Sequence, residues 1–165
     1  MDASEPVTAS DLWVESYQGE VLGESLFARL AERERDPEHR HQLEMLTVLE
    51  RATKELAEPV LEKRALDWGD TAASETTAAQ FADGLAGTSW EEFLGSFEPV
   101  ISDFLAKYRK LTDLAESETE RSVAEAYVAH ELALASFVRR GLGHEPGEPL
   151  AEILALPHVA AALAT

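Results

Sequence analysis

Apolar residues recur at helical spacing over four long stretches of the chain, and the second stretch follows the first with almost no connection. At that junction Asp36 and Pro37 place a capping acid before a first-turn proline. Because this connection is so short, the first two helices are expected to form an antiparallel hairpin. Strand-like alternation does not compete with the helical period, so we expect an all-α protein.

The second pair of helices follows a longer segment, residues 65–88, which is rich in Gly, Asp, Ser and Thr and has no strong apolar stripe. Within it, residues 75–85 can make a short helix. The third helix is expected to bend or restart at Pro99. A link of roughly 25 residues can run the length of a helix pair, which predicts a four-helix bundle with one long crossover. The predicted helices begin at caps near Ser10 or Asp11, Asp36, Ser89 with Glu92, and Ser117, and end near Arg35, Arg64, Leu114 and Gly141.

A chain of 165 residues, 45% of them apolar, is the size of one domain that buries roughly two thirds of its unfolded surface. The bundle core is expected to span residues 11–141. The remaining tail, residues 142–165, contains Pro149 and Pro157 and has room for two short C-terminal helices. We expect these two helices to cover one end of the bundle.

The charge balance restricts the partners of the protein. The chain has 32 acidic and 14 basic residues, a formal net charge of −18, so phosphate backbones and anionic lipid surfaces should repel it. We therefore expect no nucleic acid and no membrane partner. The N-terminal segment is acidic and no stretch approaches the length of a continuous apolar span, which favours a cytoplasmic location. Because the chain has no cysteine, a metal site would have to use Glu, Asp and His.

Several ionisable residues fall on the apolar faces of the predicted helices. At 100° per residue, Glu20 and Glu24 lie within the stripe of the first helix and Glu50 within that of the second. His130 lies at the centre of the stripe of the fourth helix, with Glu131 at its edge. The short hairpin puts Glu20 and Glu50 at nearly one level, so their carboxylates are expected to meet. The other inward or neighbouring polar groups are Thr53, Tyr17, Tyr108 and Tyr127.

Three ionised glutamates in a packed core cost several kcal/mol each unless something compensates their charge. A divalent cation is the simplest compensation, and glutamates with an imidazole suit iron or manganese. Glu20, Glu50 and His130 are the first candidates for ligands. Glu24 and Glu131 are candidates for a second metal or for groups around the first. Tyr17, Thr53, Tyr108 and Tyr127 are candidates for pocket residues or for hydrogen bonds to the ligands.

This arrangement resembles the ferritin-like superfamily, which includes the rubrerythrins and the diiron-carboxylate four-helix bundles, over residues 11–141. In that family each half of the bundle supplies one Glu from its first helix and a Glu-x-x-His pair from its second. By this resemblance Glu20 matches the first position and Glu50 the second. It implies one or two iron ions, an oxidoreductase or oxygenase activity on an unknown substrate, and an electron-donor protein or diffusible donor.

The ligand pattern departs from that family at three places. Thr53 stands where a histidine is expected three residues after Glu50, and the third helix has no central glutamate. The fourth helix offers the adjacent pair His130 and Glu131 instead of Glu-x-x-His. The one literal match, from Glu38 to His41, lies in the first turn of its helix and is expected at the surface. His144 and His158, in the tail, are expected to be solvated or to pack.

Three alternatives stay open. The inward glutamates can form a metal-free polar layer with Lys107, His130 and the tyrosines, in a helical module that binds a partner or a ligand. A homodimer is compatible with Leu22 and Leu132, which lie off the inner faces of their helices. A small-molecule pocket is the third alternative, and its expected lining is Trp13, Tyr17, Phe27, Tyr127 and Phe137.

Overall fold

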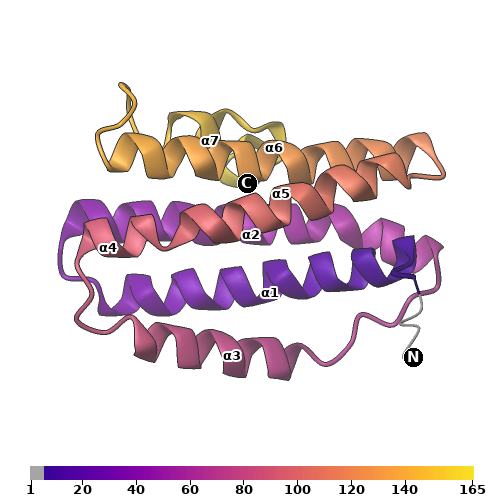
Figure 1. Cartoon of the computed structure of the whole chain (residues 1–165), viewed down its shortest axis with the longest axis horizontal. Helices are drawn as coiled ribbons and strands as arrows, with labels where there is room; N and C mark the ends of the chain where they lie inside the picture. The colour runs from indigo at the N-terminus through magenta and orange to yellow at the C-terminus, as the bar shows by residue number, and fades with distance from the viewer. Residues whose placement is uncertain (1–5) are drawn as a thin grey trace.

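The computed structural model describes residues 6–165, and all regular structure in that range is helical (Figure 1). The prediction of an all-α protein is therefore confirmed. The helices are α1 (Ala9–Arg33), α2 (Pro37–Lys63), α3 (Thr71–Gly84), α4 (Trp90–Gly95), α5 (Phe97–Asp113), α6 (Glu118–Gly141), α7 (Ala151–Ala155) and α8 (Pro157–Leu163). No helix among these is both long and apolar enough to cross a membrane.

Side-chain caps set where the long helices begin. The carboxylate of Asp36 accepts hydrogen bonds from the two backbone N–H groups that follow Pro37, as predicted, so α1 and α2 form a tight hairpin. The predicted first cap, Ser10 or Asp11, is wrong. Thr8 caps α1 instead: its hydroxyl accepts from the backbone N–H of Asp11, and the carboxylate of Asp11 accepts from the backbone N–H of Thr8, which completes a capping box.

The third predicted helix is divided into α4 and α5. The capping box of Ser89 and Glu92 begins α4 as predicted, and α4 ends at Gly95. The break precedes Pro99, because its ring lacks an N–H and would clash with the carbonyl four residues earlier, that of Gly95. The helix therefore restarts at Phe97, two residues before the proline.

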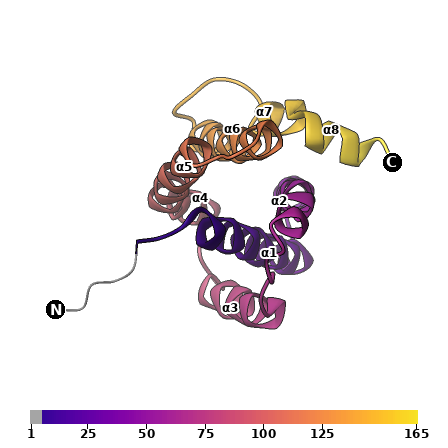
Figure 2. The same cartoon turned by 90° about the vertical axis from the view of Figure 1, so that its right-hand side faces the viewer.

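The four long helices, α1, α2, α5 and α6, lie side by side, and α3 packs against α1 on the side away from α6 (Figure 2). The link between the two helix pairs is thus more helical than its composition predicts. Ala78 and Ala82 of α3 are fully buried against Leu26 of α1, and Leu22 packs there too. Because alanine side chains are small, α3 has no pronounced apolar stripe in its sequence. The same small side chains allow α3 and α1 to pack closely. The extra contact expected of Leu22 is therefore with α3 of the same chain.

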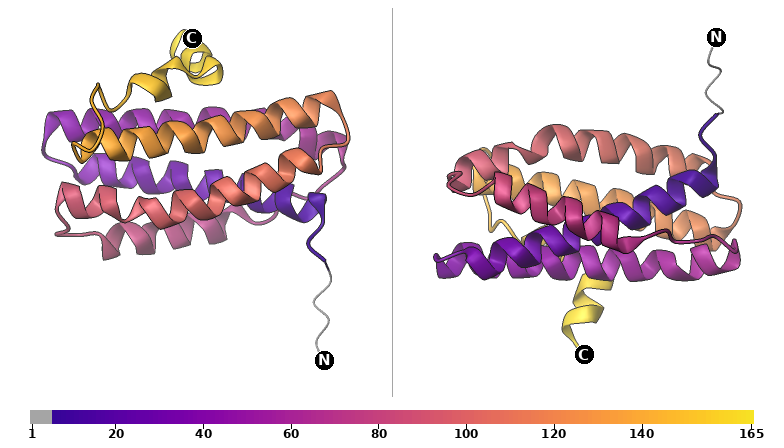
Figure 3. Two further views of the ribbon diagram at one scale, coloured as in Figure 1. Left: turned by 45° about the horizontal axis from the view of Figure 1, so that its top comes forward. Right: turned by 90° about the horizontal axis from the view of Figure 1, so that it is seen from below.

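The tail does not cover an end of the molecule. Helix α7 packs against α6, and α8 packs against the flank of α2, far from its ends (Figure 3). Ile153 and Val159 anchor the two helices by full burial of their side chains. This arrangement brings His158 to the middle of α2, where its Nε2 lies 3.0 Å from Oγ1 of Thr53.

The apolar core of the long helices is divided into two clusters. One contains Phe27, Leu46 and Phe137, and the other contains Trp13 and Tyr127. Along α1, α2 and α6, the residues between the two clusters include the buried Glu20, Glu50, Thr53 and His130. A polar layer therefore crosses the core where the predicted site lies.

Candidate metal centre

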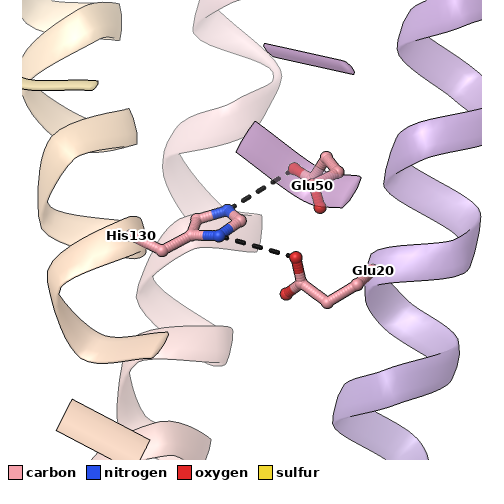
Figure 4. A group of neighbouring side chains, drawn as sticks. All are labelled: Glu20, Glu50 and His130. Carbon is pink, nitrogen blue, oxygen red and sulfur yellow. Dashed lines mark ion pairs between the residues drawn. The ribbon is translucent and has the colours of Figure 1, made fainter. Parts of the chain in front are cut away.

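Glu20 of α1, Glu50 of α2 and His130 of α6 converge in the polar layer (Figure 4). One ligand atom from each residue lies within 4.8 Å of the other two. Each nitrogen of the His130 imidazole faces one carboxylate: its Nδ1 is 3.5 Å from Oε2 of Glu20, and its Nε2 is 3.5 Å from Oε1 of Glu50. The three residues are 2%, 6% and 1% exposed, so bulk water does not compensate their charges.

Gly23 provides the space for the carboxylate of Glu50. A Cβ atom at Gly23 would lie 2.5 Å from Oε2 of Glu50, closer than a side-chain Cβ approaches a neighbouring atom in real proteins. Gly23 lies one helical turn from Glu20, on the same face of α1. Sequence reasoning missed this residue, although a glycine one turn from an inward glutamate was the available signal.

Thr53 holds the imidazole of His130. Its Oγ1 lies 2.9 Å from the carbonyl oxygen of Leu49, 2.9 Å from Nδ1 of His130 and 3.0 Å from Nε2 of His158. A hydroxyl has one hydrogen, and the carbonyl can only accept. All three contacts can be hydrogen bonds at the same time only if the Thr53 hydroxyl donates to the carbonyl of Leu49 and accepts from both imidazoles. In that arrangement Nε2 of neutral His130 presents its lone pair toward Glu50.

Burial and mutual repulsion disfavour a second negative charge beside Glu50. Burial, and then the charge of Glu50, raise the pKa of Glu20 well above its usual value, against a hydrogen bond of 3.2 Å donated by the Tyr108 hydroxyl. Burial lowers the pKa of His130, but the carboxylate of Glu50 outweighs it and the net pKa is raised. Without a cation the cluster therefore retains protons on Glu20 or His130.

The donor set fits a divalent cation. Oxygen and imidazole nitrogen ligands suit iron and manganese. The separation of 3.5 Å between Nε2 of His130, the nitrogen that presents a lone pair, and Oε1 of Glu50 is longer than a good hydrogen bond. It is somewhat longer than the roughly 3.0 to 3.4 Å between neighbouring ligands that share one ion at about 2.1 Å. Oε2 of Glu20 is buried and accepts no hydrogen bond from any residue of the described range, so it has a free coordination position.

Glu24 does not belong to the cluster, contrary to the prediction. Its carboxylate makes ion pairs with Lys54, at very short range, and with Arg51 at 2.8 Å. Partial burial opposes ionisation, but the hydrogen bonds from these two cations lower its pKa. The reason is its place at the edge of the α1 stripe, from which its side chain reaches the outer face of α2 and not the core.

Glu131 is buried, with 4% exposure, but lies outside the group of three residues whose ligand atoms converge. Burial raises its pKa to about 7 against the favourable charge of His130. It accepts no hydrogen bond and makes no ion pair with residues 6–165, and it faces a cavity described below. Glu131 therefore lies beside His130 in the sequence and is buried, but its carboxylate is not one of the converging ligand atoms.

The four predicted neighbours of the site differ in how closely they approach it. Thr53 and Tyr108 contact ligand candidates through the hydrogen bonds given above. Tyr127 is fully buried and packs edge-on against Tyr108. The hydroxyl of Tyr17 instead points to Glu58, at 3.4 Å, while its ring packs on Trp68, so Tyr17 does not contact the cluster.

Several residues discussed in the sequence lie at the surface, away from the polar layer. Glu38, His41 and His144 are exposed, as predicted. Lys107 pairs with Glu15 at 3.2 Å and does not join a polar layer.

His158 lies next to the site, and the sequence did not predict this. Its approach to Thr53 depends on how the tail folds back onto α2.

A cavity of about 610 Å³, which we call the α3–α5 cavity, lies over α1 between these two helices. Its walls include Leu22, Leu26, Phe81, Phe97, Val100 and Phe104, and Glu20, Glu50 and Glu131 reach it from the core. The predicted aromatic pocket is wrong in all but Phe27, the one residue of that set that lines this cavity. Trp13 and Tyr127 are fully buried in one core cluster and Phe137 in the other, so none of the three lines the cavity.

Comparisons of the whole chain found no matching family model, no matching curated protein and no matching solved structure.

Proposed function

We propose that the chain is a metal-binding protein with a ferritin-like four-helix bundle, in which Glu20, Glu50 and His130 hold an Fe²⁺ or Mn²⁺ ion. The observation that carries the proposal is the convergence of these three buried side chains on one point of the core. We further propose an oxidoreductase or oxygenase activity. The adjoining α3–α5 cavity supports it, because it gives a substrate access to the same point.

The donor set supports one ion per chain. A second ion would need further ligands, but Glu24 is engaged by Arg51 and Lys54. Glu131 lies outside the converging group. In place of the two-iron centre of the diiron-carboxylate bundles, we therefore propose a single site with two carboxylates and one imidazole.

A bound iron ion would supply redox chemistry with dioxygen or peroxide. The protein contributes the surroundings. Thr53 fixes the tautomer and orientation of His130 by accepting its Nδ1–H, and Tyr108 holds Glu20 by donating to Oε1. The apolar clusters pack on both sides of the layer, and the α3–α5 cavity reaches it from a third side. Glu20 can give up or retain a proton as the charge of the site changes.

Metal analysis tests the proposal. The purified protein, without tag or chelator, is loaded anaerobically with Fe²⁺ or Mn²⁺, passed over a desalting column and assayed by mass spectrometry of the metal. We expect about one ion per chain for the wild type and at least a tenfold weaker affinity for Glu50→Gln. The matched control is Glu55→Gln, an exposed residue of the same helix, which should bind like the wild type. Wild-type binding by Glu50→Gln, or no retained ion in the wild type, would contradict the proposal.

A metal-free binding module is the second candidate function. The imidazole that faces two carboxylates favours it, because a protonated His130 with one proton on the carboxylates compensates the layer without a cation. In this case the Glu50→Gln protein should be as stable as the wild type or more stable, since removing a buried charge is often neutral or stabilising. Urea unfolding of both proteins after metal loading separates the candidates, because only a bound ion would stabilise the wild type specifically.

A further inference from the structure

The α3–α5 cavity is apolar on its walls and acidic at its floor. Phe81 of α3 and Val100 of α5 stand at its mouth, 53% and 44% exposed. Leu26, Phe97 and Phe104 form walls below them. A volume of about 610 Å³ falls within the range of pockets that bind small molecules.

Two glycines shape the bottom of the cavity. Gly19 and Gly23 line it on one face of α1, and a Cβ atom at Gly19 would lie 3.3 Å from the ring of Phe104. Without side chains at these positions, the carboxylate of Glu50 reaches past Gly23 to the floor. The cavity is therefore built into the packing of α1 and is continuous with the polar layer.

Of the three acids at the floor, Glu131 is the one without a direct partner, and only the nearby charge of His130 favours its ionised form. Glu20 and Glu50 face His130, and a divalent cation would neutralise both. Glu131, with 4% exposure, has neither a hydrogen bond nor an ion pair with any described residue. Of the residues in the described part of the chain, no Lys or Arg lines the cavity. A buried carboxylate without a partner favours a ligand that brings a donor or a positive charge.

We propose that the α3–α5 cavity binds a small apolar amine, with its hydrocarbon part against the walls and its ammonium group on Glu131. An anionic amphiphile such as a fatty acid would place its carboxylate beside three others, so the cavity should reject it. A neutral alcohol would fill the same space but gain no ion pair. Binding does not require the metal; that the amine is also the substrate rests on the proposed function.

Calorimetric titration of the metal-free protein with octylamine, octanol and octanoate, in about 0.15 M NaCl to screen the surface acids, tests this assignment. We expect octylamine to bind roughly tenfold or more tightly than octanol, and octanoate not to bind. Glu131→Gln should lose that preference and keep the affinity for octanol. The matched control is Glu125→Gln, an exposed acid of the same helix, which should behave like the wild type and so reports nonspecific attraction.

If Glu131→Gln folds poorly, a second variant that fills the cavity can still test whether the amine binds there. Val100→Trp places an indole at the mouth, on an exposed position of α5 where it should not disturb the core, and should abolish binding of both octylamine and octanol. Undiminished octylamine binding by Val100→Trp, or equal binding of octanoate and octylamine by the wild type, would overturn the site. A protein that retains iron but binds no amine would overturn the ligand assignment alone. A protein that binds amine but no metal would keep this site and remove the metal centre.

Discussion

At the scale of single residues, Thr53 links the imidazole of His130 to the tail. It occupies the position where the ferritin-like pattern would have a histidine, one turn after Glu50, and it accepts hydrogen bonds from both His130 and His158. A metal-binding imidazole needs an acceptor for its other N–H, and such acceptors control metal affinity by about 10- to 100-fold. In the proposed metal centre Thr53 would therefore be a positioning residue for His130.

Thr53→Val removes this acceptor and keeps the shape of the side chain. We expect metal affinity to fall about tenfold, measured by competition with a chromophoric chelator. Thr47→Val is the control, because Thr47 is also buried on α2 and its hydroxyl also bonds the carbonyl four residues earlier, that of Leu43. Equal losses in both variants would mean that Thr53 acts on the helix and not on His130.

Gly23 gives a second prediction at this scale. In Gly23→Ala the new methyl group would lie 2.5 Å from Oε2 of Glu50, so the carboxylate must move. We expect weaker metal binding and a loss of about 1–3 kcal/mol in the free energy of unfolding, despite the higher helix propensity of alanine. Gly95→Ala, where a Cβ atom meets nothing within 4 Å, should be neutral or stabilising. Chemical unfolding and the chelator assay measure both effects.

At the scale of helices, one ion pair joins the end of α2 to the start of α6. Arg64 donates from Nε to Oε1 of Glu120 at 2.8 Å and from its terminal nitrogen to Oε2 at 3.0 Å. Glu120 also accepts from the backbone N–H of Glu116 at 2.8 Å. The hydrogen bond from Arg64 is the largest influence on Glu120 and, against burial, lowers the pKa of its carboxyl. This pair fixes the register between two helices that the chain connects only indirectly.

The lowered pKa predicts how this contact depends on pH. A carboxyl whose pKa is lower in the folded state stabilises it fully above the unfolded value of 4.5, and the contribution is lost as the pH falls through the folded value. We expect Glu120→Gln to lower the free energy of unfolding by about 2 kcal/mol at pH 7. The difference from the wild type should shrink below about pH 4. Urea unfolding across this pH range measures it, with Glu118→Gln, exposed in the same helical turn, as the control. A difference that does not change with pH would exclude the ion pair as its source.

At the scale of the whole molecule, self-repulsion should limit stability. With 32 acidic against 14 basic residues, most surface acids have no cation beside them, and folding brings them closer together. Raising NaCl from about 0.02 to 0.5 M shortens the screening length severalfold. We therefore expect Tm at pH 7 to rise with salt, measured by calorimetry. The increase should vanish near the isoelectric point of about 4.5, and a fall of Tm with salt at pH 7 would show that ion pairs outweigh the repulsion.

The sequence by itself determined the helical order and the central part of the site. Asp36 and Pro37 impose the hairpin locally, and the helical period assigns Glu20, Glu50 and His130 to inner faces. Both signals depend on neighbours within a few residues, so they are readable without tertiary information. The ferritin-like relationship stays a prediction.

Only the tertiary structure decided what surrounds those three residues. A helical wheel cannot resolve edge positions, so the pairing of Glu24 with Arg51 and Lys54 depended on where α2 lies. The contact of His158 with Thr53 and the cavity beside Glu131 arise from segments distant in sequence, α8 in one case and α3 and α5 in the other. The physical reason is that the face of a helix follows from its own period, whereas its neighbours follow from packing among helices.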